Sequence, residues 1–278
     1  MAKMNKPKQS ETIEVQRIEM GEAKFNLLGT SPMIVNRFNQ KARQELLCPG
    51  ESVNAAALEQ TLKHDPVTEF RGAFYRNRDP KTPTLFHVPD GAIHGALAQA
   101  AVDMPGTARA KMERLTRIVD VNINLYGIPL LFMSMVRNSG MNRAPDVRTR
   151  PIFPEWACTF NVRWVKSVVT EKTVTNLLNA AGIIVGIGDW RGEKGGSYGA
   201  FELVGDDNPN FKRIVRDQGR KAQQAAYDTP IFYDEDTTEL MTWFEGEVTR
   251  RERDLPSSPP KTKRGVTITN GRDEIQTG

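Results

Sequence analysis

The chain has 278 residues, of which 38 are lysine or arginine and 34 are aspartate or glutamate, for a formal net charge of +4. Apolar residues make up 38% of the sequence and charged residues 26%, which excludes wholly disordered, collagen-like and fibrous classes. No stretch approaches the roughly 20 apolar residues that a membrane helix requires, and Met1 to Ser10 lacks the apolar block of a signal peptide. Two cysteines, Cys48 and Cys158, are too few for a disulfide framework. We therefore expect a cytoplasmic protein without membrane contact.

Six segments with regular apolar spacing follow one another through the middle of the chain. Strict alternation of apolar and polar residues is typical of a half-buried strand, whereas apolar residues three and four apart are typical of a helix that covers a core. In chain order the segments are a strand around 23–27, a helix with Asp90 as candidate N-cap, strands at 119–125 and 156–164, a helix between Thr170 and Gly182, and a short strand at 199–204. The residues expected to face the core are Val119, Val121, Ile123 and Leu125 in the second strand, and Trp156, Cys158, Phe160, Val162 and Trp164 in the third.

The order strand, helix, strand, strand, helix, strand predicts an α+β, ferredoxin-like (RRM-like) core: an antiparallel sheet with both helices on one face. Two long insertions, at 29–89 and 127–154, interrupt this core, and insertions of that length are typical of functional segments. Because residues 1–11 and 251–278 are polar and without apolar periodicity, we expect both to be disordered. The remaining chain divides into a core at 12–205 and a helical, acidic C-terminal part at 206–250.

The charge is unevenly distributed along the chain. Between Pro105 and Lys166 there are ten basic residues and four acidic ones, while between Glu202 and Glu247 there are eleven acidic and five basic. Arginine binds phosphate with paired hydrogen bonds, so the basic stretch is typical of contact with a polyanion backbone, the alternative being an ordinary solvated surface. The acidic part can dock on a neighbouring subunit, recruit a partner protein, or form a surface helix; its candidate contact residues are Phe232, Tyr233, Trp243 and Phe244.

Six glycines fall within the fourteen residues from Gly186 to Gly199, interleaved with aromatic and basic residues. Glycine allows close backbone approach and positive φ, so backbone N–H groups there can contact phosphate or sugar, and Trp190 or Tyr198 can stack on an unpaired base. The loop matches neither the P-loop pattern nor a dinucleotide-binding pattern. The alternative is a mobile connection between the second helix and the last strand.

Two segments carry a resemblance to a known family. The stretch from Phe86 to Leu97 resembles the P-x-x-x-I-x-G-A-L start of the first helix in RAMP-superfamily proteins, and Gly186 to Phe201 is similar to the glycine-rich loop before their last strand. Arg148 to Phe201 also resembles a group of uncharacterised tailed-phage and prophage proteins. The superfamily includes the backbone subunits of CRISPR effector complexes, which have a ferredoxin-like core with finger, thumb and palm elaborations.

The resemblance implies a subunit that assembles into a helical filament along single-stranded DNA or RNA. The insertion at 29–89 would be finger-like and that at 127–154 thumb-like, while Gly192 to Gly199 would approach the strand. A phage-encoded role in replication, recombination or counter-defence fits better than a CRISPR effector. The expected nucleic-acid-binding residues are Arg37, Lys41, Arg43, Arg137, Arg143, Arg148, Arg150, Trp190, Arg191, Lys194 and Tyr198.

We expect no enzyme activity, cofactor or metal. The chain has three histidines and no C-x-x-C spacing, so a zinc site lacks ligands. The cleaving subunits of the resembling family carry an aspartate early in the loop after the first strand, and none stands between Gly29 and Arg37. Acidic runs at 206–207 and 234–236 can bind Mg²⁺, but acidic turn residues are usually solvated. Two other classes stay open: a protein that binds a host complex without nucleic acid and, third, a metal-dependent nuclease.

Overall fold

The computed structural model describes residues 17–37, 64–137 and 145–254. The chain divides into two compact units, Met1–Leu240 and Met241–Gly278. The strands are β1 (Met20–Gly29), β2 (Met33–Ile34), β3 (His87–Pro89), β4 (Thr116–Ile118), β5 (Asn122–Tyr126), β6 (Leu130–Arg137), β7 (Pro145–Phe153), β8 (Ala157–Val165) and β9 (Phe201–Val204). The helices are α3 (Pro66–Gly72), α4 (Asp90–Asp103), α5 (Arg109–Leu115), α6 (Glu171–Ala180), the π-turn η1 (Ala181–Val185), the 3₁₀ turn η2 (Gly192–Lys194), α7 (Pro209–Asp217), α8 (Arg220–Asp228) and α9 (Glu235–Asp254).

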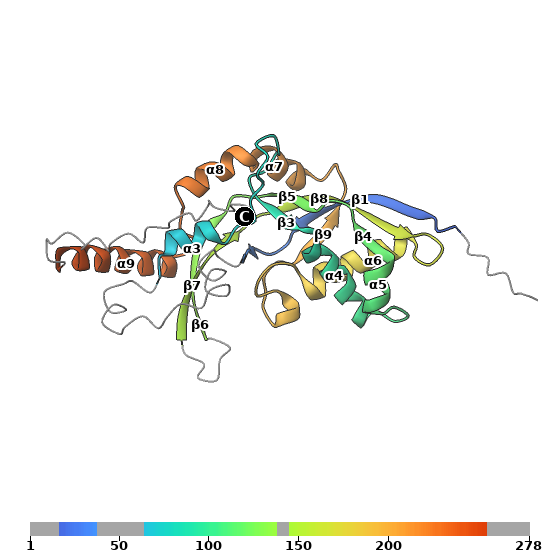
Figure 1. The fold of residues 1–278 in the computed structure, drawn as a ribbon, viewed down its shortest axis with the longest axis horizontal. Coiled ribbons are helices and arrows are strands. Elements are labelled where there is room, and N and C mark those ends of the chain that lie inside the picture. The colour runs from blue at the N-terminus through green and yellow to red at the C-terminus, as the bar shows by residue number, and fades with distance from the viewer. Residues whose placement is uncertain (1–16, 38–63, 138–144, 255–278) are drawn as a thin grey trace, which may run out of the picture. The chain divides into compact units, whose positions relative to one another are not determined.

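The main sheet has the ferredoxin-like topology that the sequence predicts. Its strands lie in the order β3-β5-β8-β1-β9, each pair is antiparallel, and β4 also pairs with β8. The strands β9, β1, β8 and β5 are the fourth, first, third and second of the βαββαβ unit. Figure 1 shows α4 and α6, the two helices of that unit, on the same face of the sheet. The α+β, ferredoxin-like fold is therefore confirmed.

The core lies between this sheet and the two helices. All five residues predicted to point inward from 156–164 are buried, and Phe25 of β1 lies opposite Phe160 of β8 with ring centroids 6.4 Å apart. The second helix begins after Thr170, whose side chain accepts a hydrogen bond from the Thr173 N–H, and it buries Val174. These elements form where apolar periodicity and end signals in the sequence agree.

Two local predictions are wrong. The strand expected at 119–125 begins only at Asn122 in β5, because residues 119–121 lie between β4 and β5; Val119 and Val121, expected to be buried, are 36% and 68% exposed. The Asp120 carboxylate accepts a hydrogen bond from the backbone N–H of Asn161 at 2.7 Å, so a side chain takes the place of a backbone acceptor between the two strands. Asp90 is not the N-cap of α4: it is the first helical residue, and Pro89 occupies the cap position without a side-chain hydrogen bond.

The two insertions form a second sheet together. The first contributes β2 and the second contributes the hairpin β6–β7, and the strand order is β2-β7-β6. Residues 38–63 and 138–144 of these insertions lie outside the described residues. Segments separated by about a hundred positions in sequence thus share one set of ladder hydrogen bonds, with Met33 opposite Phe153.

The C-terminal part is helical, as predicted, and its first two helices pack on the core unit. Phe211 and Ile214 of α7 cover Leu28 on the sheet face opposite α4 and α6. Gln223 of α8 is fully buried: its amide donates to the Leu125 and Gly127 carbonyls at 2.7 and 3.0 Å. None of the described helices is both long and apolar enough to cross a membrane.

Candidate nucleic-acid interface

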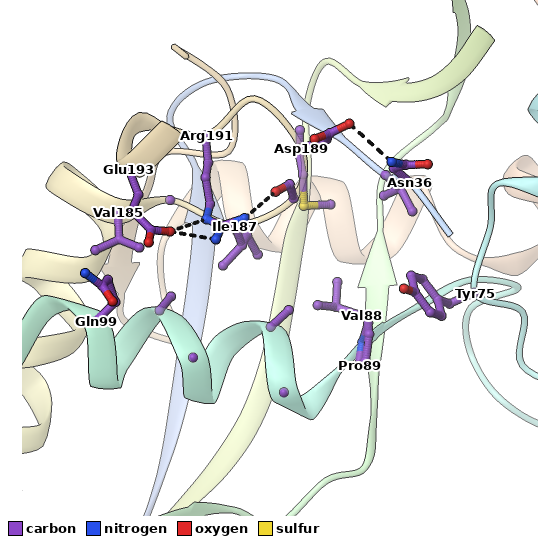
Figure 2. Close-up of a pocket in the computed structure, with 18 of the residues that line it drawn as sticks. Asn36, Tyr75, Val88, Pro89, Gln99, Val185, Ile187, Asp189, Arg191 and Glu193 are labelled. Carbon is purple, nitrogen blue, oxygen red and sulfur yellow. Dashed lines mark hydrogen bonds and ion pairs between the residues drawn. The ribbon is translucent and has the colours of Figure 1, made fainter. Parts of the chain in front are cut away.

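A cleft of about 380 Å³ lies between α4 and the glycine loop. Figure 2 shows α4 along one side of it, and Arg191 and Glu193 on the wall opposite that helix. The segment after β2 and strand β3 lie at one end of it, through Asn36, Val88 and Pro89. The cleft therefore draws on the first insertion, the first core helix and the loop before the last strand.

Small residues line most of the α4 side of the cleft. Gly91, Gly95 and Gln99 lie one turn apart on the helix face that lines the cleft, and a Cβ atom added at either glycine would meet nothing within 4 Å. The start of α4 has no side-chain cap; the Asp90 N–H donates to the Val121 carbonyl at 3.2 Å, and Asp90 is an acidic residue in the first turn. The two glycines therefore leave room for a ligand backbone to approach this helix face closely.

The glycine loop is fixed in place by backbone hydrogen bonds. The Asp189 N–H donates to the Ile34 carbonyl at 2.9 Å, and the Gly199 N–H donates to the Pro32 carbonyl at 2.8 Å. Gly199 has φ +73°, and an added Cβ there would collide with the Ile187 carbonyl oxygen. The glycines let the loop fold tightly on itself and on β2, so it forms a wall and not a loose connection.

The loop wall carries an arginine whose charge is balanced locally. The Arg191 guanidinium donates to Glu193 Oε2 at 2.9 and 2.6 Å, and Lys194 Nζ lies 3.6 Å from Glu193 Oε1. Burial acts to raise the pKa of Glu193, but the hydrogen bond from Arg191 and the charges of Arg191 and Lys194 outweigh it and hold that pKa below its usual range. Glu193 is therefore a carboxylate at neutral pH.

Arg109 of α5 also lines the cleft. Its guanidinium donates to Gln99 Oε1 at 2.7 Å and to Glu113 Oε1 at 2.9 Å. The hydrogen bond to Glu113 raises the pKa of Arg109 most, and the charges of Glu113 and Glu193 raise it further. Arg109 was counted within the basic stretch of the sequence, but its place at the cleft depends on the packing of α5 beside α4, which periodicity does not reveal.

Arg150 of β7 forms an ion pair with Asp189, and Asn36 Nδ2 lies 3.4 Å from the same carboxylate. The Arg150 guanidinium also lies 5.9 Å from the centroid of the Trp190 ring. Burial lowers the pKa of Arg150, as does the charge of Arg148, and Glu69 acts in the opposite direction. The pair joins the second insertion to the glycine loop, so Arg150 has a structural partner in addition to its expected role.

The two aromatic residues of the loop pack on other rings. Trp190 and Tyr198 lie 6.4 and 6.5 Å from Phe132 of β6, and 6.3 Å from each other. Tyr233, a candidate partner contact, belongs to the same cluster, with its ring 5.5 Å from Phe132. Both loop aromatics stay half-buried. Stacking of either ring on a base stays a prediction. A base could contact only the part of each ring that this cluster leaves uncovered.

The other predicted binding residues are dispersed. Arg37 donates to the Phe74 carbonyl at 3.3 Å, and its guanidinium lies 5.9 Å from the Tyr75 ring centroid. Arg137 is exposed near the end of β6, and Arg148 on β7 lies 3.3 Å from Asp146. Three of the predicted residues lie outside the described part of the chain: Lys41, Arg43 and Arg143. Of the predicted basic residues that the structure describes, Arg191 alone lies in the lining of the cleft.

Two further residues of the cleft were not predicted. His87 and Tyr75 lie at the β3 end with ring centroids 5.9 Å apart. Burial, followed by the charge of Arg37, lowers the pKa of His87, and His87 Nδ1 is buried without a hydrogen-bond partner. The sequence gives no signal that His87 and Tyr75 line the cleft, because the first insertion, which carries both residues, has no pattern that shows where it packs.

No group of three or more potential metal ligands occurs within the described ranges. Asp206 accepts hydrogen bonds from Lys24 Nζ and Asn26 Nδ2, both at 2.7 Å, and Asp234 accepts one from the Thr237 N–H at the start of α9. The first residue of each acidic run considered for Mg²⁺ is therefore already hydrogen-bonded to other residues of the chain. Of the remaining candidate partner contacts, Trp243 is 68% exposed, Phe244 is half-buried and Phe232 bridges to Leu131.

Comparison with known proteins gives one distant structural similarity. No protein-family model matches the chain, and no curated protein matches it. Among solved structures it is similar to Cmr6 from Pyrococcus furiosus, with 10% sequence identity, a TM-score of 0.30, and coverage of 68% of this chain and 100% of that chain. The ferredoxin-like assignment accordingly rests on the strand order and pairing described above.

Proposed function

We propose that the protein binds single-stranded nucleic acid in the cleft between α4 and the glycine loop. The observation that carries this proposal is the α4 face of the cleft, where Gly91 and Gly95 leave an open surface. A phosphodiester backbone fits such a surface because it can approach the helix closely while Arg109 and Arg191 in the same lining bind its phosphates.

The charge of the cleft indicates how strong such binding is. Arg109 and Arg191 are opposed by Asp189 and Glu193 within the same lining, so few phosphates are neutralised at this site. Binding is therefore of moderate affinity, independent of base sequence, and dependent on salt with a slope set by a small number of contacts.

Assembly into a filament along the strand and a phage-encoded role in replication, recombination or counter-defence are also part of the proposal. Their support is the resemblance of Phe86 to Leu97 and Gly186 to Phe201 to RAMP-superfamily segments. We propose a non-catalytic role, which predicts that labelled DNA and RNA stay intact in the presence of Mg²⁺ or Mn²⁺. Cleavage that chelation abolishes would replace it with the nuclease alternative.

The test is a titration of the protein into labelled 30-nucleotide single-stranded DNA and RNA across a range of salt. We expect binding that weakens with salt, and cooperative binding if the protein forms a filament. Arg191→Ala should weaken binding. Arg213→Ala should not, because Arg213 of α7 pairs with Glu155 and does not line the cleft. Failure to bind either strand at low salt would refute the proposal.

One observation favours a second candidate, a protein-binding role. Trp243 on α9 is 68% exposed within the acidic helix, and an exposed tryptophan flanked by charge is typical of an interaction surface. Retention of a host protein by the wild-type chain, lost on Trp243→Ser, in a preparation that binds no nucleic acid would support this role in place of the first.

A further inference from the structure

Glu193 is surrounded by cations at the edge of the cleft. Its carboxylate accepts two hydrogen bonds from Arg191, lies 3.6 Å from Lys194 Nζ, and acts electrostatically on Arg109. Its side chain is 21% exposed, so solvent and ligands can still reach it. Arg191 and Lys194 thus contact one carboxylate, and Arg109 lies in the same cleft lining.

The donors that hold Glu193 are those that hold a phosphate. The Arg191 guanidinium presents N–H groups to a carboxylate oxygen in the geometry it would present to a phosphate oxygen, so the two anions compete for the same site. Both groups lie in the lining of the cleft, where the proposed function places the strand.

The pair contributes little to holding the fold. Arg191 and Glu193 are two positions apart in the same loop, so their ion pair joins no distant elements. The Arg150–Asp189 pair in contrast joins strand β7 to the loop. Partly exposed pairs between near neighbours have small effects on stability, so exchange of Glu193 for another anion does not disturb the wall.

We propose that Arg191, Lys194 and Arg109 form a phosphate subsite, and that Glu193 occupies this subsite in the unbound protein as an internal competitor. This inference rests on the proposed function for the identity of the ligand. Binding of a strand releases Glu193 from Arg191 and places a phosphate of the strand there. Glu193 therefore lowers the affinity of the protein for nucleic acid.

The sharpest test is Glu193→Gln, which removes the charge and keeps the size of the side chain. We expect it to bind single-stranded DNA or RNA about five- to tenfold more tightly at low salt, since Arg191 no longer has to leave a carboxylate. The slope of log affinity against log salt should stay close to the wild-type value, because the bound strand places the same phosphate at Arg191 in both proteins.

A matched control separates this effect from a general change in charge. Glu155→Gln removes the same charge from a carboxylate that Arg213 holds at 2.6 and 3.1 Å outside the cleft lining. Arg191→Ala added to Glu193→Gln should abolish the gain, because the two residues act through one contact. An equal gain in Glu155→Gln, or a gain that survives Arg191→Ala, would overturn the inference.

The measurement distinguishes the inference from the proposed function. If the wild-type protein binds the strands and Glu193→Gln binds them no more tightly, the inference fails and the proposed function stands. If the wild-type protein binds neither strand, the proposed function fails, and titration of Glu193→Gln and wild type with inorganic phosphate decides the subsite. Tighter, Arg191-dependent phosphate binding by Glu193→Gln would support the subsite, and equal binding would refute it.

Discussion

Substitutions at Gly95, on the α4 face that lines the cleft, should have opposite effects on the stability of the protein and on its affinity for nucleic acid. Gly95 is the sixth of fourteen helical residues, and a Cβ atom there would meet nothing within 4 Å. Glycine within a helix costs roughly 0.5–1 kcal/mol relative to alanine. Gly95→Ala should therefore raise the free energy of unfolding by about that amount, which corresponds to a Tm increase of roughly 1–4 °C for a protein of this size.

Gly95→Leu should keep this helical gain and block the cleft. The leucine side chain would enter the cleft of about 380 Å³ beside Gln99, where a strand must pass to reach α4. We expect affinity for single-stranded nucleic acid to fall by at least about tenfold, or about 1.4 kcal/mol.

Fluorescence anisotropy with labelled DNA and RNA measures the binding, and thermal unfolding measures the stability. Asn176→Leu adds a similar side chain to an exposed position of α6 outside the cleft and should leave binding unchanged. Wild-type affinity in a folded Gly95→Leu protein would refute the path of the strand across α4. A loss of affinity together with a loss of stability would instead show that α4 is perturbed.

Two further predictions concern the walls of the cleft. The folded-state pKa of His87 is depressed below the ordinary value of 6.5, so the contribution of this residue to stability is present above about pH 6.5 and is lost as the pH falls. His87→Gln should therefore reduce the decrease in Tm between about pH 7.5 and 5.5. An unchanged decrease would exclude His87 as its source. Gly199→Ala should destabilise the protein by about 3 kcal/mol in denaturant unfolding, because the φ of +73° at Gly199 and the nearby Ile187 carbonyl both oppose a Cβ atom. A loss of less than about 1 kcal/mol would show that the loop can rearrange.

Periodicity predicts the elements whose burial repeats along the chain, and it fails where one side chain changes the path. The strands at β1 and β8 and the helices α4 and α6 follow from apolar spacing. The segment 119–125 has equally clear spacing, yet its first three residues lie between β4 and β5, where the Asn161 N–H bonds the Asp120 side chain and Val121 is exposed to solvent. A hydrogen bond between residues about forty positions apart leaves no local signal in the sequence.

Only one wall of the cleft follows from a site prediction. The glycine loop was expected to approach a strand and forms that wall, whereas the start of α4, which forms the other wall, carried the family resemblance but no predicted binding residue. The roles of Trp190 and Tyr198 could not be derived, because Phe132 and Tyr233, which pack on them, come from β6 and from the segment before α9. The sequence shows which residues can stack on a ring, and the tertiary structure determines how much of each ring is already covered.

The two acidic residues of the glycine loop have different parts in the wall: Asp189 helps to hold the loop in place, and Glu193 can give up its place to another anion. Asp189 interacts with Arg150 of the second insertion and with Asn36 of the first, and its own N–H is bound to β2. Glu193 interacts with Arg191 and Lys194, both within two positions of it. Loss of the Asp189 carboxylate would remove side-chain contacts that join the loop to both insertions, whereas displacement of Glu193 rearranges only neighbouring side chains. A loop built in this way can exchange Glu193 for a phosphate at one end while Asp189 keeps its backbone in place, which is the condition that a preformed binding surface must meet.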